Sequence, residues 1–508
     1  MPRNTTLMHS IIVTLLFSLS GTVAAAENSV QSQPTSASFE SVKPGSCATL
    51  KPSKPAQEQP NILFILLDNI GKDWFRCYGS QENVTPNIDR LARTGVKFRN
   101  FYVTPVCSTT RVGLLTGRYP YRTGWHTHHD PAIYGGGYFD WNREISIARI
   151  LKNAGYQTFI SGKWQINDLF DPAQKDALAK HGFDEYCIFP EGKKEHPAHK
   201  KRYWDPYIIE NGKRIETTGQ YGPEIFTAKL IEFMTRQKEE GDKPFFAYYP
   251  AILTHLSIGP TPDNKTTNGR ELSDRELFVG MAQYADTLVG RMVSALDNLG
   301  LRDNTIVIVA TDNGTDDGSY HGYENLAGRV NGRYAEIGST MKPNDDGYYP
   351  LTEWGINMPL IVNCPQHIPG GRESDDLIDM TDILPTIADF GQAKLPKSVK
   401  IDGRSFAPQL RNSNHDKPWR TWCLSQYCEV RVVRNQRFKL FSSGQFYDLS
   451  VDPREQNDLQ RSVELRNDQA TKAAHRNLQK ILDDLPANAK LPWEFRSISA
   501  RQIQAAKQ

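Results

Sequence analysis

The sequence lacks a strong excess of charge of either sign and any long hydrophobic run beyond its first residues. Lysine and arginine number 60 against 58 aspartate and glutamate residues, for a formal net charge of +2. This near balance provides no broad field to attract nucleic acid or an anionic membrane, so a site for anions must be built locally. After the N-terminal segment, no apolar stretch is long enough to span a bilayer.

The first 26 residues have the features of a signal peptide rather than of a folded domain. Arg3 supplies the positive end, the run IIVTLLFSL supplies the apolar part, and small residues precede a cleavage site after Ala26. No cysteine stands at that site, so a lipid anchor is not expected there. We expect residues 1–26 to be removed and the mature protein to be exported, periplasmic or secreted, and soluble.

Cysteine is scarce, with seven residues in 508. In an oxidising compartment cysteines tend to pair, and an odd number leaves at least one of them unpaired. The spacing of the seven does not reveal which of them pair, so the disulfide pattern stays open.

Composition and patterning divide the rest of the chain. Residues 27–59 are rich in serine, proline, glutamine and lysine and lack apolar periodicity, which is typical of a flexible leader. Residues 60–410 form the predicted main domain. Residues 411–490 hold two or three short strands and then a charged helix over 460–485, an antiparallel-sheet-plus-helix subdomain, and residues 491–508 form a polar tail.

The main domain alternates strands and helices. The continuous apolar runs NILFILL and TIVIVAT predict strands buried on both faces, and VKFRNFYV predicts another strand. Thr85, Pro86 and Gly95 mark the beginning and end of one helix, and Ser273 and Glu276 in capping-box spacing begin a second. This alternation predicts an α/β fold, with a large mixed, mostly parallel sheet flanked by helices and a smaller C-terminal α+β subdomain.

Polar pairs follow two of the predicted buried strands. Asp68 and Asn69 follow NILFILL, and Asp312 and Asn313 follow TIVIVAT. Ligands of open α/β sheets gather at the carboxyl ends of strands, and these oxygen atoms suit Ca²⁺ or Mg²⁺ better than zinc. Taken alone, each pair is better explained by a turn after its strand.

A lone cysteine precedes hydroxyl residues and an arginine in the segment CSTTRVGLLTG. Thr109 or Thr110 is expected to cap a short helix that ends near Gly117, which places Cys107 by the positive end of the helix dipole. Arg111 adds a fixed positive charge one turn along. The alternative is a buried structural thiol, which is the commoner state of an isolated cysteine.

Nine segments in the same order together resemble the type I sulfatase family, an arylsulfatase-like family of the alkaline-phosphatase-like superfamily. The resemblance covers nearly all of residues 60–460 and includes a variant C-S-T-T-R signature. It rests on PNILFILLDN, TPNIDRLARTGVKFRNFY, CSTTRVGLLTGRYP, GYQTFISGKW, KPFFAYYPAILTH, TIVIVATDNG, DMTDILPTIADFG, IDGRSFAPQL and FKL…FYDLSVDPREQNDL. Residues 60–410 would then be a sulfatase catalytic domain.

The resemblance implies that a formylglycine-generating or anaerobic sulfatase-maturating enzyme oxidises Cys107 to formylglycine. The hydrated aldehyde is then the nucleophile, and a divalent cation (Ca²⁺, or Mg²⁺ as the alternative) stabilises charge on the sulfate. Arg111 is expected to hold the diol, while Lys163 and His255 match residues that bind sulfate and protonate the leaving group. A surface lysine and a loop histidine are the structural alternatives for those two. The implied metal ligands are Asp68, Asn69, Cys107 in its modified form, Asp312 and Asn313.

The sequence departs from the family pattern within these motifs. Thr109 and Thr110 stand where the signature has proline and serine, which changes the conformational bias of the segment that the maturating enzyme reads. Asn69 stands where the family has a second aspartate, so the cation is expected to bind less tightly. Both departures bear directly on whether the chain is an active enzyme.

Three further positions are predicted to contact substrate. Gln165 stands where a histidine follows the lysine, and it cannot take up a proton near neutral pH. Lys342 is the predicted second active-site lysine, at an unusually long spacing from Glu353. His126 belongs to a histidine-rich loop that is expected to shape the pocket or, alternatively, to bind a transition metal. The neighbouring residues expected to suit an anionic, ring-bearing ligand are Arg118, Arg122, Trp125, His128 and His129.

These features predict a sulfuric ester hydrolase that acts on a sulfated carbohydrate, either a small molecule or an oligosaccharide. A phosphate or phosphonate ester hydrolase on the same scaffold is one alternative. A pseudoenzyme that binds sulfated glycans without turning them over is the other, and the departures from the family pattern favour it. Neither nucleic acid nor, after signal cleavage, a membrane is an expected partner.

Overall fold

The computed structural model describes residues 59–491 with internal gaps. The predicted signal peptide, the leader up to residue 58, and the predicted site residues Lys342, His128 and His129 lie outside the described residues. So does the predicted tail after residue 491. The gaps are 83, 128–136, 193–195, 198–200, 242, 256–257, 265–269, 316–350, 413–418 and 463–467.

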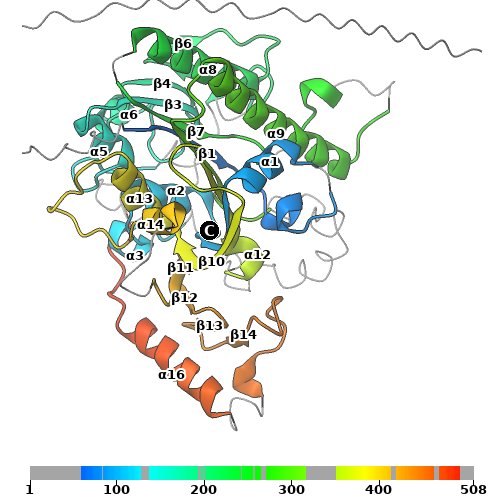
Figure 1. The fold of residues 1–508 in the computed structure, drawn as a ribbon, viewed down its shortest axis with the longest axis vertical. Helices are drawn as coiled ribbons and strands as arrows, with labels where there is room; N and C mark the ends of the chain where they lie inside the picture. The colour runs from blue at the N-terminus through cyan, green and yellow to red at the C-terminus, as the bar shows by residue number, and fades with distance from the viewer. Residues whose placement is uncertain are drawn as a thin grey trace, which may run out of the picture. The chain divides into compact units, whose positions relative to one another are not determined.

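A ten-stranded mixed sheet forms the centre of the main domain, in the order β10-β2-β9-β8-β1-β7-β3-β4-β5-β6 (Figure 1). Its middle strands, β8, β1, β7, β3 and β4, run parallel, whereas β9, β5 and the edge strand β6 pair antiparallel with their neighbours. The strands are β1 Asn61–Leu67, β2 Val96–Tyr102, β3 Gln157–Lys163, β4 Glu185–Phe189, β5 Ile208–Glu210, β6 Lys213–Ile215, β7 Phe245–Pro250, β8 Thr305–Thr311, β9 Asn357–Asn363 and β10 Arg372–Asp379.

Helices cover both faces of this sheet. Successive residues of β1 point to opposite faces and all are buried, so its run of apolar side chains contributes to two separate cores. One face is covered by α1, α8 and α9, and the other by α2, α5 and α13 (Figure 1). The helices are α1 Pro86–Thr94, α2 Cys107–Thr116, α3 Pro120–Thr123, α5 Ile147–Asn153, α6 Ala177–Lys180, α8 Gly222–Glu240, α9 Asp274–Asn298, α12 Glu353–Ile356, α13 Ile383–Phe390 and α14 Ala407–Arg411.

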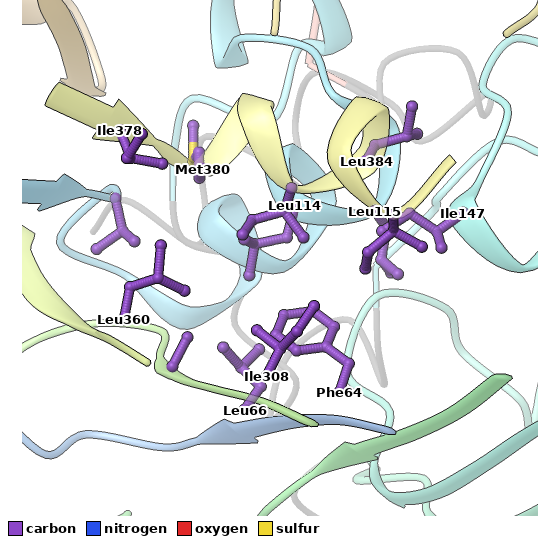
Figure 2. Close-up of a cluster of buried hydrophobic side chains, with 14 of the residues drawn as sticks. Phe64, Leu66, Leu114, Leu115, Ile147, Ile308, Leu360, Ile378, Met380 and Leu384 are labelled. Carbon is purple, nitrogen blue, oxygen red and sulfur yellow. The ribbon is translucent and has the colours of Figure 1, made fainter. Parts of the chain in front are cut away.

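The core beneath α2 fixes that helix against the sheet. Figure 2 shows Phe64 and Ile308 of the central strands facing Leu114 and Leu115 of α2, with Leu384 of α13 packed alongside. Each fully buried side chain of this size contributes roughly 1.5–3 kcal/mol. The N-terminal end of α2 is therefore held rigidly at the edge of the sheet.

The C-terminal part forms a separate four-stranded antiparallel sheet, β11-β12-β13-β14, with α16 packed against it (Figure 1). Two or three strands were expected, and the structure has four: β11 Cys423–Tyr427, β12 Val430–Arg434, β13 Phe438–Phe441 and β14 Phe446–Asp448. The helix, predicted from Gln460, instead begins later, as α16 Gln469–Asp483. It begins there because the Asp468 side chain accepts hydrogen bonds from the Ala470 and Thr471 N–H groups.

Several other predictions of local structure are confirmed. Both apolar runs are buried strands, α1 lies between Thr85 and Gly95, and Ser273 and Glu276 form the capping box of α9. Cys77, Cys107, Cys187, Cys364 and Cys423 form no disulfide among the described residues. No helix among the described residues is both long and apolar enough to cross a membrane.

Candidate active site

Two buried carboxylates meet at one edge of the sheet. Strands β1 and β8 are parallel neighbours, with Leu67 opposite Thr311, so the residues that follow them lie side by side. Asp68 and Asp312 occupy these positions and are completely buried. The Asp312 backbone N–H donates to the Leu67 carbonyl over 3.1 Å, which continues the strand pairing up to the acidic residues.

The two asparagines complete this cluster. Asn69 adopts the left-handed backbone conformation, with φ of 54°, which asparagine tolerates better than most residues. Its N–H donates to Asp312 Oδ1 over 3.2 Å, and its Oδ1 accepts from Asn313 Nδ2 over 2.7 Å. The four polar residues after the two strands therefore form one connected group.

This group has the chemistry of a site for a hard cation. Asp68 Oδ1 and Asn313 Oδ1 are buried and have no hydrogen-bond partner among the described residues. Buried oxygen atoms without partners are costly unless a ligand satisfies them. Carboxylate and amide oxygens are the preferred ligands of Ca²⁺ and Mg²⁺, so these residues fit the implied ion.

Cys107 is the first residue of α2, at the same edge of the sheet. The predicted cap by Thr109 or Thr110 is wrong, because Val106 is the N-cap residue and provides no side-chain cap. Both threonines lie within the helix, where their hydroxyls contact the Thr104 hydroxyl. The first-turn N–H groups therefore remain at the end of the helix that carries Cys107, where an anion is favoured.

Arg111 ties the two carboxylates to the helix. It is buried, and its Nε and Nη2 donate to Asp312 Oδ2 over 3.0 Å and 2.7 Å. Its Nη2 also lies 3.5 Å from Asp68 Oδ2. Burial opposes the charge, but Asp312 and Asp68 more than compensate and raise the pKa of Arg111, so the guanidinium stays positive.

Lys163, the last residue of β3, projects into the same space. Its Nζ is 2.8 Å from Asp68 Oδ2 and 3.6 Å from Cys107 Sγ. Burial lowers its pKa, but the carboxylates nearby outweigh burial and raise it, so the ammonium stays protonated. The preceding residue, Gly162, lies close to the end of β7. A side chain would not fit there, because a Cβ at position 162 would lie 2.1 Å from the Pro250 carbonyl oxygen.

His255 follows β7 and is half-buried. Ligand atoms of His255, Asp68 and Cys107 all lie within 4.8 Å of one another. The Tyr203 hydroxyl donates to the His255 carbonyl oxygen and, over 3.1 Å, to that of Ile252, which fixes this loop. The imidazole is therefore held beside the thiol and the carboxylate.

The charges in the site influence one another strongly. Burial raises the pKa of Asp68, but Lys163, His255 and Arg111 outweigh burial and hold it below its ordinary value. Burial and the Asp68 charge raise the pKa of Asp312 to about 7. Two adjacent buried carboxylates repel each other, and a divalent cation would relieve that repulsion.

Burial also raises the pKa of the Cys107 thiol, to about 11. The thiolate, not the thiol, is the nucleophilic form of cysteine. An unmodified Cys107 is therefore protonated and poorly nucleophilic at neutral pH, even though a lysine lies beside it.

The other residues predicted to contact the substrate are buried or have partners of their own. Gln165 is buried two residues after β3, and its Oε1 has no hydrogen-bond partner among the described residues. His126 is buried, and its carbonyl oxygen accepts from the Cys428 N–H. The role expected of Arg118, Arg122 and Trp125 at an anionic ligand stays a prediction. The first two pair with Glu144 at 2.6 Å and Asp402 at 2.7 Å, and the tryptophan is a core residue.

A charged pair near the site was not anticipated from the sequence. Glu191 follows β4 and places its Oε1 3.9 Å from Lys163 Nζ. Arg202 Nη1 lies 3.1 Å from the same oxygen. No signal in the sequence marks Glu191, because its position depends on a left-handed backbone conformation, with φ of 53°, after the strand.

Glu353, which the sequence linked to a second active-site lysine, has structural partners. It accepts hydrogen bonds from the Tyr102 hydroxyl at 2.7 Å, Asn357 Nδ2 at 3.0 Å and Lys439 Nζ at 3.2 Å. Arg434 Nη1 lies 3.5 Å away. Because Lys439 and Arg434 belong to the small sheet, this carboxylate connects that sheet to the main one.

Comparison with known proteins gives family matches over most of the chain. The profile of the family described as Sulfatase matches residues 60–393. A second profile, described as N-sulphoglucosamine sulphohydrolase, C-terminal, matches residues 350–485. The two profiles overlap over residues 350–393, which contain β9 and β10 of the main sheet.

Among curated relatives, N-acetylgalactosamine-6-sulfatase of Homo sapiens is 30% identical over 375 residues, covering 70% of this chain and 66% of that protein. The match thus spans slightly less than two thirds of that relative. Arylsulfatase A of Bos taurus is 29% identical over 432 residues, covering 78% of each chain.

Solved structures share the fold. A crystal structure in complex with k-i-k-neocarrahexaose superposes with a TM-score of 0.65 at 24% identity, covering 88% of this chain and 99% of that chain. Another, in complex with its substrate D-glucosamine-2-N,6-O-disulfate, gives a TM-score of 0.61 at 23% identity, covering 84% and 98%. The predicted fold class is thereby confirmed.

Proposed function

Because the chain belongs to the sulfatase family, we propose that it hydrolyses sulfate esters of carbohydrates. In this proposal a maturating enzyme of the formylglycine-generating or the anaerobic type first oxidises Cys107 to formylglycine. Residues 1–26 direct export, residues 60–410 provide the catalytic domain, and residues 411–490 provide the smaller subdomain.

One observation supports this function above all: the Cys107 side chain lies among groups suited to sulfate chemistry. The Lys163 ammonium is 3.6 Å from its sulfur, and Asp68 and His255 place ligand atoms within 4.8 Å. The buried thiol has a raised pKa, so cysteine chemistry as such is disfavoured there. A modified side chain explains why so many charged groups surround this position.

The charged residues around position 107 have different proposed roles in sulfate ester hydrolysis. Lys163 carries a fixed positive charge for the nonbridging oxygens of a sulfate, and the N-terminal end of α2 adds its N–H groups. Arg111 positions Asp312 and neutralises it. We assign to His255, which is less buried than its neighbours in the cluster, the donation of a proton to the departing alcohol oxygen.

We assign the cation to Asp68, Asn69, Asp312 and Asn313, with Ca²⁺ preferred and Mg²⁺ as the alternative. The two unpartnered buried oxygens, Asp68 Oδ1 and Asn313 Oδ1, support this assignment. When bound, the cation would polarise the sulfate group and the formylglycine would supply the oxygen nucleophile.

Asn69→Asp is expected to tighten Ca²⁺ binding about 10–100-fold, because it adds a carboxylate beside the cation. Asn313 Nδ2 retains an acceptor at position 69, so the local hydrogen bonding is preserved. The dissociation constant is measured by titration calorimetry on the intact protein. Asn142→Asp, on an exposed turn, is the matched control and should leave the constant unchanged. Equal or weaker binding by Asn69→Asp would remove Asn69 from the ligand set.

The sugar preference is inferred from the relatives. The N-acetylgalactosamine-6-sulfatase that matches this chain at 30% identity bears a name that refers to a sulfated amino sugar. A sulfated carbohydrate, as a monosaccharide or within an oligosaccharide, is therefore the proposed substrate class.

The test is release of inorganic sulfate by matured protein with Ca²⁺, measured by ion chromatography on a panel of sulfated monosaccharides and oligosaccharides. N-acetylgalactosamine 6-sulfate belongs in the panel, and matched phosphate esters serve as controls. We expect sulfate release from at least one sugar. Faster release of phosphate would favour the phosphate ester hydrolase, and binding without release would favour the non-catalytic glycan-binding protein.

A further inference from the structure

Next to the proposed catalytic group lies a line of alternating charges. Lys163 Nζ is 3.6 Å from Cys107 Sγ, Glu191 Oε1 is 3.9 Å from Lys163 Nζ, and Arg202 Nη1 is 3.1 Å from Glu191 Oε1. Glu191 is buried, with 5% of its side chain exposed, whereas 21% of the Arg202 side chain is exposed. The line therefore runs from the reactive position to a partly exposed cation.

The Arg202 side chain is held in place, yet some of its hydrogen-bond donors have no partner among the described residues. Its guanidinium lies over the Phe189 ring, 5.2 Å from the ring centroid, which limits its motion. Within the described part of the chain its ion pair is with Glu191, through Nη1 alone. Its Nε and Nη2 make no hydrogen bond to the described residues, which leaves them for a ligand.

Arg118 and Arg122, which the sequence suggested for an anionic ligand, form ion pairs with acidic residues. Arg118 Nη1 donates to Glu144 over 2.6 Å. Arg122 Nε donates to both oxygens of Asp402, over 2.7 Å and 2.8 Å. Arg202 differs from both because its partner, Glu191, also lies beside Lys163, which connects Arg202 to the proposed catalytic group.

We propose that Arg202 is a specificity residue that binds a second oxyanion of the substrate, either a carboxylate or a further sulfate. This group belongs to the sugar being cut or to its neighbour. Glu191 is the positioning residue, since its buried carboxylate holds Arg202 toward Lys163 and separates the two cations. The substrate class is thus narrowed from sulfated sugars in general to carbohydrates with at least two negative groups, and the inference rests on the proposed function.

The physical basis is the fork of the guanidinium. Arginine binds carboxylate or sulfate through two parallel charge-assisted hydrogen bonds, which are stronger than those between neutral groups. A lysine offers a point charge without that geometry. A substrate with a single sulfate places nothing on Arg202, so its loss should matter only when a second anion is present.

The experiment compares Arg202→Met and Arg202→Lys with the wild-type chain on two substrates: an aryl sulfate with one anion and a disulfated disaccharide. For Arg202→Met the ratio of kcat/KM for the disaccharide to that for the aryl sulfate should fall about 10–100-fold, mainly through KM. Arg202→Lys should recover part of the loss. Arg214→Met is the matched control, because Arg214 also lies over an aromatic ring, 4.7 Å from the Tyr207 centroid, and should leave the ratio unchanged.

An equal loss on both substrates, or no loss on either, would overturn the role of Arg202. Binding is measured separately by calorimetry with the disulfated disaccharide in a Cys107→Ala background, which holds the sugar uncleaved. Arg202→Met should weaken that binding by a similar factor, and unchanged binding would again overturn the inference. If the wild-type chain releases no sulfate yet this binding effect is present, the proposed function fails, and only the role of Arg202 in binding a second anion stands.

Discussion

Cys107→Ala is expected to lower sulfate-ester hydrolysis by matured protein at least about 10⁴-fold, the scale on which loss of a nucleophile acts. The reason is local. The side chain at position 107 lies close to both Lys163 and His255, and alanine has no group to convert into a nucleophile. The fold should persist, because removal of one small thiol leaves the core beneath α2 untouched. Initial rates on an aryl sulfate, with circular dichroism as a check on folding, measure the effect.

The matched control is Cys77→Ala, at a half-buried cysteine in the short 3-10 helix Arg76–Tyr78, which should retain wild-type rates. Mass spectrometry of the peptide that contains residue 107 provides a second measurement. Conversion of cysteine to the aldehyde lowers its mass by about 18 Da, the mark of an activated nucleophile. Retention of activity by Cys107→Ala, or activity with an intact thiol, would contradict the assignment.

Glu353→Ala is expected to lower the free energy of unfolding by about 3–5 kcal/mol, as when one partner of a buried ion pair is removed. The variant leaves the Lys439 ammonium, which is completely buried, without one of its two carboxylates. It also removes the acceptor of the Tyr102 hydroxyl. Urea unfolding monitored by fluorescence measures the change.

The control is Glu232→Ala, which breaks an exposed pair with Lys229 and should cost less than about 1 kcal/mol. The effect of Glu353 has a defined pH dependence. Burial raises its pKa, but Lys439 and Arg434 outweigh burial and lower it to about 2 from an ordinary 4.5. Its contribution is therefore present at neutral pH and lost as the pH falls from about 4.5 toward 2. Glu353→Gln should flatten that part of the curve, and an unaltered acid profile would show that the network is not coupled to folding.

The elements that could be predicted from sequence are those whose signals are local. The apolar run of β1 and the capping box at Ser273 need no information from distant parts of the chain. The cap of α2 could not be predicted, because the hydroxyls of Thr109 and Thr110 meet Thr104 in a buried cluster. Nor could the insertion of antiparallel β9 between β8 and β2, which depends on long-range pairing.

The same division applies to the site. Residues at strand ends were expected to converge, and Asp68 and Asp312 do share Arg111. Their roles in catalysis remain predictions. The sequence contains no motif that marks Glu191 or Arg202, because their proximity to Lys163 depends on the path of the chain after β4.

The position of Glu353 also bears on how the protein can be divided. Helix α12, which leads into strand β9 of the large sheet, contributes this carboxylate, and the small sheet contributes the cations that neutralise it. A fragment that ends near residue 410 would leave the Glu353 carboxylate without its cationic partners. The small sheet expressed alone would leave Lys439 with Glu455 as its remaining acidic partner. We therefore expect truncation at the boundary near residue 410 to destabilise both parts. The two sheets should unfold in a single cooperative transition.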